Sequence, residues 1–184
     1  MISSDRVRRI LALALPIVGG MVSQNVLNLV DAAMVGHLGD AALAGVGLGG
    51  FLNFLSSALL LGLSAGVQAM ASRRVGESRA TVAAYPLNGG LLFALCLAIP
   101  WSALVWISAP RFFALVTDDT SVLQQGVPYL QARLVAMTAM VMNFSFRGYW
   151  NAVDRSLLYM GTLILMHALN IFFNWMFIFE PRSA

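Results

Sequence analysis

The residues best placed to do chemistry in this chain form two polar stripes inside long apolar segments. The stripes consist of Gln24, Asn28 and Asp31 near the beginning, and of His167, Asn170 and Asn174 near the end. Their spacings, i, i+4, i+7 and i, i+3, i+7, put the members of each stripe on one helical face. If the stripes converge, Asp31, Asn170 and Asn174 offer hard oxygen ligands for Na⁺, or hold a proton on the carboxylate.

The segments around the stripes are long enough to cross a membrane. Of the 184 residues, 59% are hydrophobic and only 10% are charged, whereas a soluble domain has about 25% charged residues. This composition excludes an ordinary soluble globule and also a disordered chain. A membrane helix needs about 20 apolar residues. Five segments qualify, and we expect an all-α integral membrane protein with spans at about 10–35, 41–71, 86–109, 127–146 and 157–179.

An ionisable side chain inside a bilayer is costly, so Asp31 is a candidate functional residue. Three structural readings remain open beside the functional one. Asp31 is close enough to its helix end to reach the lipid headgroups. Asn170 and Asn174 would also serve as hydrogen-bonding contacts between helices, and His167 as a buried packing residue.

The arginines predict the orientation of the spans. All 11 basic residues are Arg, and Arg133, inside the fourth segment, is not assigned to either side. Only Arg111 and Arg182 lie on one side, with acidic neighbours such as Glu180. The other side has eight, namely Arg6, Arg8, Arg9, Arg73, Arg74, Arg79, Arg147 and Arg155. By the positive-inside rule the N-terminus is cytoplasmic and the C-terminus lies outside.

Several functional classes find no support in the sequence. The arginines form no continuous basic stripe, so we expect no nucleic-acid partner. The chain contains no G-x-S-x-G, H-E-x-x-H or Walker A motif, and an enzyme is not expected. The single cysteine, Cys96, excludes an internal disulfide and a zinc site built on cysteines.

Several stretches resemble the multidrug and toxic compound extrusion (MATE) family, with most likeness to its DinF-like branch. The resemblance rests on LALPI at 13–17, DAAMVGHLG at 31–39 and AALAGVGLGG at 41–50. It is supported by RG at 147–148 and NAVDR at 151–155, which resemble the family's link between helices four and five. The first-helix motif is fairly specific, and the likeness extends over nearly the whole chain.

The resemblance implies a fold and a function. Family members have twelve helices in two six-helix lobes around a central cavity. They exchange Na⁺ or H⁺ for small organic, often cationic, compounds by alternating access, without a cofactor. By motif position, the family's cation or proton site in the N-terminal lobe falls on Asp31, Asn170 and Asn174. Residues 1–184 would then be an incomplete N-terminal lobe in the inner (cytoplasmic) membrane.

Two departures from the family pattern affect these expectations. Some members carry Asp where this chain has Asn174, so a second titratable group is missing. The chain also has no counterpart of helix six or of the second lobe, and we expect it to be a truncated product that alone transports little. Alternative readings are a related lipid-linked oligosaccharide flippase, which a basic cavity would favour, and a membrane subunit without transport activity.

Overall fold

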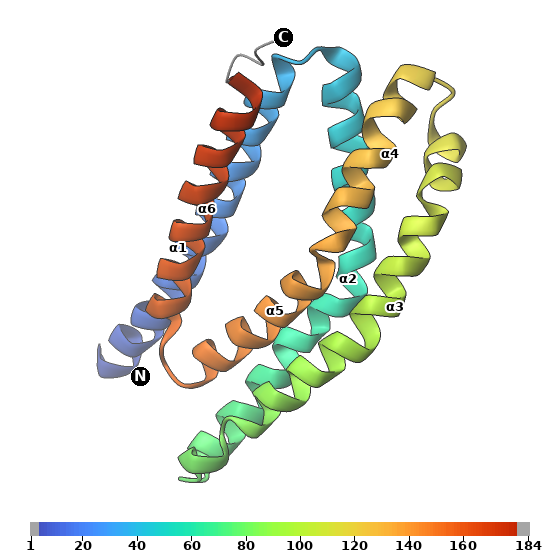
Figure 1. Ribbon diagram of the computed structural model, residues 1–184. Coiled ribbons are helices and arrows are strands. Elements are labelled where there is room, and N and C mark those ends of the chain that lie inside the picture. The colour runs from blue at the N-terminus through green and yellow to red at the C-terminus, as the bar shows by residue number, and fades with distance from the viewer. Residues whose placement is uncertain (1–3, 180–184) are drawn as a thin grey trace.

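The computed structural model describes residues 4–179, and within that range all regular structure is helical (Figure 1). The elements are α1 (Ser4–Gly36), α2 (Asp40–Gly76), η1 (Ala80–Val82), α3 (Tyr85–Val116), α4 (Thr120–Val135), α5 (Met137–Ala152) and α6 (Ser156–Phe179). The expected all-α fold class is confirmed. Glu180 and Arg182, which were expected on the outer side, lie outside the described residues.

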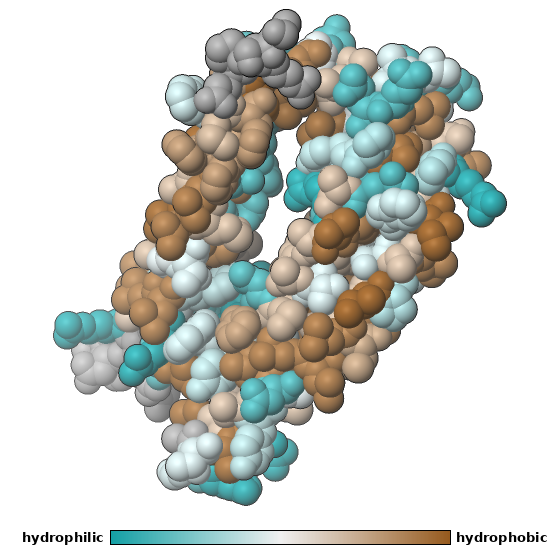
Figure 2. All heavy atoms as spheres, viewed as in Figure 1, coloured by the Kyte–Doolittle hydropathy of each residue, from teal (hydrophilic) through white to brown (hydrophobic). Residues whose placement is uncertain are grey.

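Four helices are long and apolar enough to cross a membrane, judged by length and composition. They are Ile10–Gly36, Asp40–Gly76, Tyr85–Val116 and Ser156–Phe179. Large hydrophobic side chains are exposed along all four helices, and brown, hydrophobic residues cover much of the face shown in Figure 2. Water would disfavour such a surface, whereas lipid tails are as apolar as these side chains.

The segment 127–146, expected as one helix, is divided between α4 and α5. Ala136 forms a one-residue turn between Val135 and Met137. Each helix has 16 residues, which is about 24 Å and therefore shorter than a hydrocarbon core of about 30 Å. Arg147 also differs from expectation, because it lies within α5 and not at the turn before α6.

The helices form two groups (Figure 1). Helices α2 to α5 pack against one another, whereas α1 and α6 run side by side in the same direction as a separate arm. The arm touches the rest of the molecule mainly through α2 and α5, its neighbours in the chain. Figure 2 shows an opening between the arm and the remaining helices, with hydrophilic residues on both sides of it.

The core of the larger group lies where α3, α4 and α5 meet. Phe113 from α3 is fully buried there, together with Leu130, Leu134, Met137 and Val141. The last four residues are spaced i, i+4, i+7 and i+11, so one helical face stays buried across the α4–α5 junction. The break therefore redirects the helix without removing its apolar face from the core.

Helix α2 comes unusually close to α4 and α5 at glycines. A Cβ atom on Gly45 would lie 2.9 Å from the main-chain nitrogen of Gly126 in α4. A Cβ atom on Gly148 in α5 would collide with the main-chain oxygen of Ser64 in α2. Small residues of this kind let membrane helices pack backbone to backbone.

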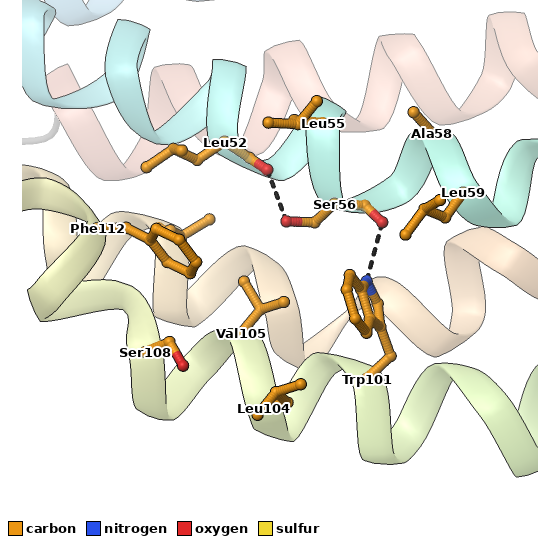
Figure 3. A pocket seen from close by; sticks show the side chains of 11 residues that line it. Leu52, Leu55, Ser56, Ala58, Leu59, Trp101, Leu104, Val105, Ser108 and Phe112 are labelled. Carbon is orange, nitrogen blue, oxygen red and sulfur yellow. Dashed lines mark hydrogen bonds between the residues drawn. The ribbon is translucent and has the colours of Figure 1, made fainter. Parts of the chain in front are cut away.

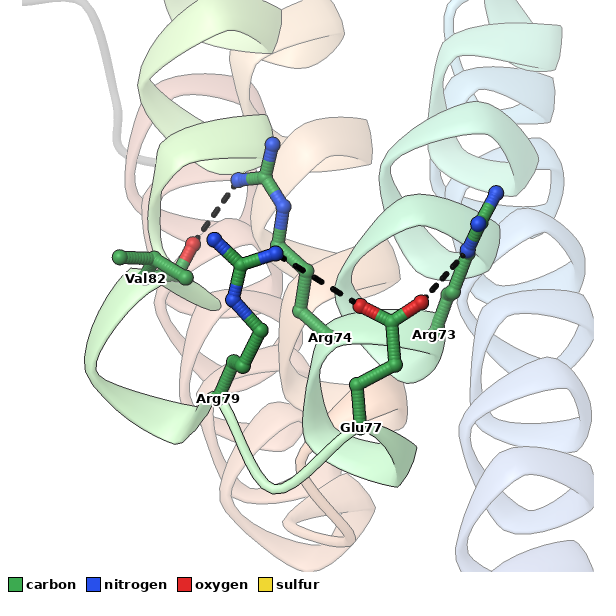
Figure 4. Close-up of polar contacts among 5 residues, drawn as sticks. All are labelled: Arg73, Arg74, Glu77, Arg79 and Val82. Atoms are coloured by element: carbon green, nitrogen blue, oxygen red, sulfur yellow. Dashed lines mark hydrogen bonds and ion pairs between the residues drawn. The ribbon is translucent and has the colours of Figure 1, made fainter.

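Arginines at the end of α2 and in the turn after it include two that pair with Glu77 (Figure 4). Arg73 Nε donates to Glu77 Oε1 at 2.9 Å, and Arg79 Nη1 lies 3.9 Å from Glu77 Oε2. The hydrogen bond from Arg73 holds the pKa of Glu77 below its usual value, and the nearby positive charges add to this effect. The residues are exposed, so these pairs contribute little to stability, but they keep the arginines together at this end of the bundle.

Asp119 caps the start of α4. Its Oδ1 accepts hydrogen bonds from the Ser121 hydroxyl at 2.6 Å and from the Ser121 main-chain nitrogen at 2.8 Å. Because both bonds favour the ionised carboxylate, they hold the pKa of Asp119 below its usual value.

We expect Asp119→Ala to lower the midpoint of thermal unfolding by about 2–4 °C at neutral pH, because a capping bond is lost. A lowered pKa means that this contribution is present above the ordinary carboxyl pKa and disappears as the pH falls through the lowered value. The difference between variant and wild type should therefore shrink as the pH falls below the ordinary carboxyl pKa. Asp118→Ala is the matched control, and an equal deficit at acidic and neutral pH would contradict the capping role.

Candidate cation-binding site

The arm formed by α1 and α6 brings the two polar stripes together. Asn174 Nδ2 donates to Asp31 Oδ1 at 2.8 Å and to Asn170 Oδ1 at 3.1 Å. All three side chains are partly buried. The carboxylate and the two amides that the spacing suggested for one site are therefore neighbours, although 143 residues separate Asp31 from Asn174.

A second polar link joins α1 and α6 about two helical turns before Asn174. His167 Nε2 lies 3.2 Å from Gln24 Oε1, and since an amide oxygen can only accept, the ring donates there. Gln24 Nε2 in turn donates to Asn28 Oδ1 at 3.3 Å. His167 is 6% exposed, and its Nδ1 has no hydrogen-bond partner among the described residues. The two stripes are thus joined at two levels.

The side chains around Asp31 provide oxygen atoms and a single negative charge. Asp31 is the one carboxylate in the stripe, and Asn170 and Asn174 each add an amide oxygen. Among the residues that the structure describes, no group of three or more His, Cys, Asp or Glu side chains could hold a metal ion. This donor set suits a monovalent cation or a proton more than a tightly held divalent metal.

Two further side-chain hydrogen bonds connect helices outside the cation site. Tyr159 OH in α6 donates to Asn143 Oδ1 in α5 at 2.9 Å, and Arg147 Nε in α5 donates to Ser64 Oγ in α2 at 3.1 Å. Neither contact was predicted from the sequence. For Arg147 a signal was present in the sequence, because an arginine at the end of an apolar run needs an internal partner. In the structure its guanidinium also lies 5.3 Å from the ring centroid of Phe144.

A wide cavity lies elsewhere, between α2 and α3 (Figure 3). It has a volume of about 620 Å³, and its lining is mostly apolar, including Leu55, Leu59 and Leu104. The indole of Trp101 also lines the cavity, and its Nε1 donates to the main-chain oxygen of Ser56 at 2.9 Å. This groove offers no charged group and is separate from the polar site on the arm.

Comparisons with known proteins agree with the arrangement. A protein-family model described as MatE matches residues 16–176. The chain is 27% identical over 177 residues to a probable multidrug resistance protein NorM from Mesorhizobium japonicum, covering 95% of this chain and 38% of the relative. A probable NorM from Pseudomonas aeruginosa is also 27% identical, with 93% of this chain and 35% of the relative covered.

Solved structures show the same fold. An outward-facing multidrug resistance MATE family transporter of the MOP superfamily matches with a TM-score of 0.85 and 24% identity, over 95% of this chain and 39% of that chain. A MOP superfamily transporter from Pyrococcus furiosus matches with the same values. The chain thus spans less than two-fifths of the length of these relatives. With its apolar helices, the likeness identifies an integral membrane protein.

Proposed function

Since the chain belongs to the MatE family, we propose that it forms part of a transporter that exports small organic compounds in exchange for Na⁺ or H⁺. The observation that supports this proposal most directly is the hydrogen bond from Asn174 to Asp31, with Asn170 beside it. A lone carboxylate among amides inside a membrane arm needs a cationic partner for part of its cycle. The relatives named as multidrug resistance proteins support organic compounds as the exported substrates.

The cation is held by Asp31 together with the amide oxygens of Asn170 and Asn174. In the present arrangement the Asn174 N–H group occupies one carboxylate oxygen. Half a turn about the last side-chain torsion of Asn174 presents its oxygen instead, and this torsion has a broad, roughly two-fold profile. Na⁺ is then bound by oxygens alone, or a protonated Asp31 donates to the amide oxygen.

Binding at Asp31 changes the contact that joins α1 to α6, so it favours one packing of the arm over another. Pro16 lies inside α1 and removes one main-chain hydrogen bond there, which makes that region easier to bend. A cation that binds the two packings with different affinities shifts the balance between them. Export by alternating access then requires one lobe to move against a second lobe.

The chain is proposed to be part of the N-terminal lobe of such a transporter, in the inner membrane with a cytoplasmic N-terminus. Because alternating access needs two lobes, residues 1–184 alone are expected to export little. The likeness to the DinF-like branch and the choice between Na⁺ and H⁺ remain predictions.

Thermal unfolding of the purified chain in detergent tests the cation site. We compare Na⁺ with choline at equal ionic strength, at about pH 8 and about pH 6. At saturating Na⁺ we expect the midpoint to rise by about 5–10 °C at the higher pH and by less at the lower, where protons compete. A change with pH alone would favour H⁺ coupling. A midpoint that responds to neither Na⁺ nor pH would overturn the proposed site.

A further inference from the structure

A second polar site lies where α4 ends and α5 begins. A cavity of about 110 Å³ is lined by Asn53, Arg133, Ala136 and Met140. Arg133 is in the last turn of α4, and Ala136 is the turn between the helices. The junction falls at the middle of 120–152, so it lies near the middle of the layer that these helices cross. A charged side chain at that depth is costly and marks a functional site by default.

Arg133 is held in position but not neutralised. Its Nη1 donates to Tyr129 OH at 2.6 Å, and the guanidinium lies 5.6 Å from the centroid of that ring. Among the side chains that the structure describes, no carboxylate forms a salt bridge with Arg133. A guanidinium has five N–H donors, so most of its hydrogen-bonding capacity is available to a ligand.

Asn53 gives an independent indication that the cavity takes a polar group. This α2 residue is 6% exposed, and its Oδ1 is buried without a hydrogen-bond partner in the described part of the chain. Buried amides are normally hydrogen-bonded, and each exception needs an explanation. The amide of Asn53 therefore has hydrogen-bonding capacity left over, and the residue lines the cavity.

The start of α5 adds positive character to the same place. No side chain caps this helix, and the first main-chain bond of its opening turn runs from Met140 N to Ala136 O at 3.0 Å. The N–H groups before it have no partner within α5, as at the start of any helix. In interrupted membrane helices, such half-helix starts face anionic groups of substrates.

We propose that this cavity binds a carboxylate of the exported compound, with Arg133 as its charge partner. The opening turn of α5 donates main-chain N–H groups, and the amide N–H groups of Asn53, which lines the cavity, donate as well. Arg133 is also near enough to Asp31 for their charges to interact. The inference rests on the proposed function and narrows its substrates to compounds that carry a carboxylate, zwitterions included.

Two matched dyes test the proposal. Rhodamine 110 has a free carboxylate, and rhodamine 123 is its methyl ester. Binding to the purified chain in lipid nanodiscs is followed by fluorescence polarisation. We expect the wild type to prefer rhodamine 110, and Arg133→Gln to weaken that dye about tenfold while changing rhodamine 123 less than about twofold. Arg111→Gln, which removes an exposed arginine, should change neither.

A third variant guards against a purely structural effect. Arg133→Lys keeps the charge but not the planar fork, so it should retain the preference for rhodamine 110 with a smaller loss than Arg133→Gln. Equal affinity of the wild type for both dyes, or an equal loss of both in Arg133→Gln, would overturn the carboxylate site. Either result leaves the Na⁺ response of the arm unaffected, so it can be told apart from a failure of the proposed function.

Discussion

Asp31→Asn should abolish the rise in unfolding midpoint that Na⁺ produces in the purified chain. The substitution keeps the size of the side chain and can still bond to Asn174, but it removes the one negative charge that the site offers a cation. Loss of a charged ligand costs about 3 kcal/mol, which lowers Na⁺ affinity by about a hundredfold. The midpoint is measured in a Na⁺ series, with choline replacing Na⁺ at constant ionic strength.

Asp40→Asn provides the matched control, because it removes an exposed carboxylate at the start of α2. That variant should respond to Na⁺ as the wild type does. In a complete transporter that contains this lobe, Asp31→Asn should also eliminate cation-coupled efflux. Efflux that continues unchanged at saturating expression would refute the role given to Asp31.

The second large effect is expected at Gly148, where α5 packs against α2. A single added methyl group at Gly148 meets the main-chain oxygen of Ser64, which belongs to a helix and cannot rotate away. The helices must therefore separate along a contact that also includes the Arg147–Ser64 hydrogen bond. Overpacking against backbone costs about 3 kcal/mol or more, so Gly148→Ala should lower the unfolding midpoint by about 6–12 °C.

Gly161→Ala is the corresponding control in α6. A Cβ atom at Gly161 has no atom within 4 Å, so the only expected change is a gain in helix propensity of at most about 1 kcal/mol. Its midpoint should stay level or rise slightly. If both variants lost stability alike, the close approach of α5 to α2 would not be the cause.

The polar site was foreseeable because its residues repeat at helical spacing on segments of unmistakable length. The spacing alone placed Gln24 and Asp31 on one face of the first helix. It likewise placed His167 and Asn174 on one face of the last helix. It did not determine which helices pair, because the pairing of α1 with α6 depends on how all the helices pack. The convergence of Asp31 and Asn174 was suggested by their expected depth, and the structure supplies the 2.8 Å hydrogen bond.

The junction at Ala136 could not have been anticipated in the same way. Helix breaks usually occur at proline or glycine, but the nearest proline, Pro128, lies eight residues earlier and inside α4. The buried face continues from Leu134 to Met137 without a change of period, so the apolar pattern shows one helix where there are two. The position of Arg147 was missed for a related reason, because α5 continues to Ala152 beyond the expected end at 146.

The pairing of the first helix with the last has a consequence for how the protein is made. Asp31 leaves the ribosome 143 residues before Asn174, an interval of about 7–30 s at ordinary rates of synthesis. During that time α1 is in or near the bilayer with its carboxylate unpartnered, held back by the cost of burying a charge. When α6 arrives, Asn174 can donate to Asp31, so we expect the last helix to lower the cost of keeping the first in the bilayer.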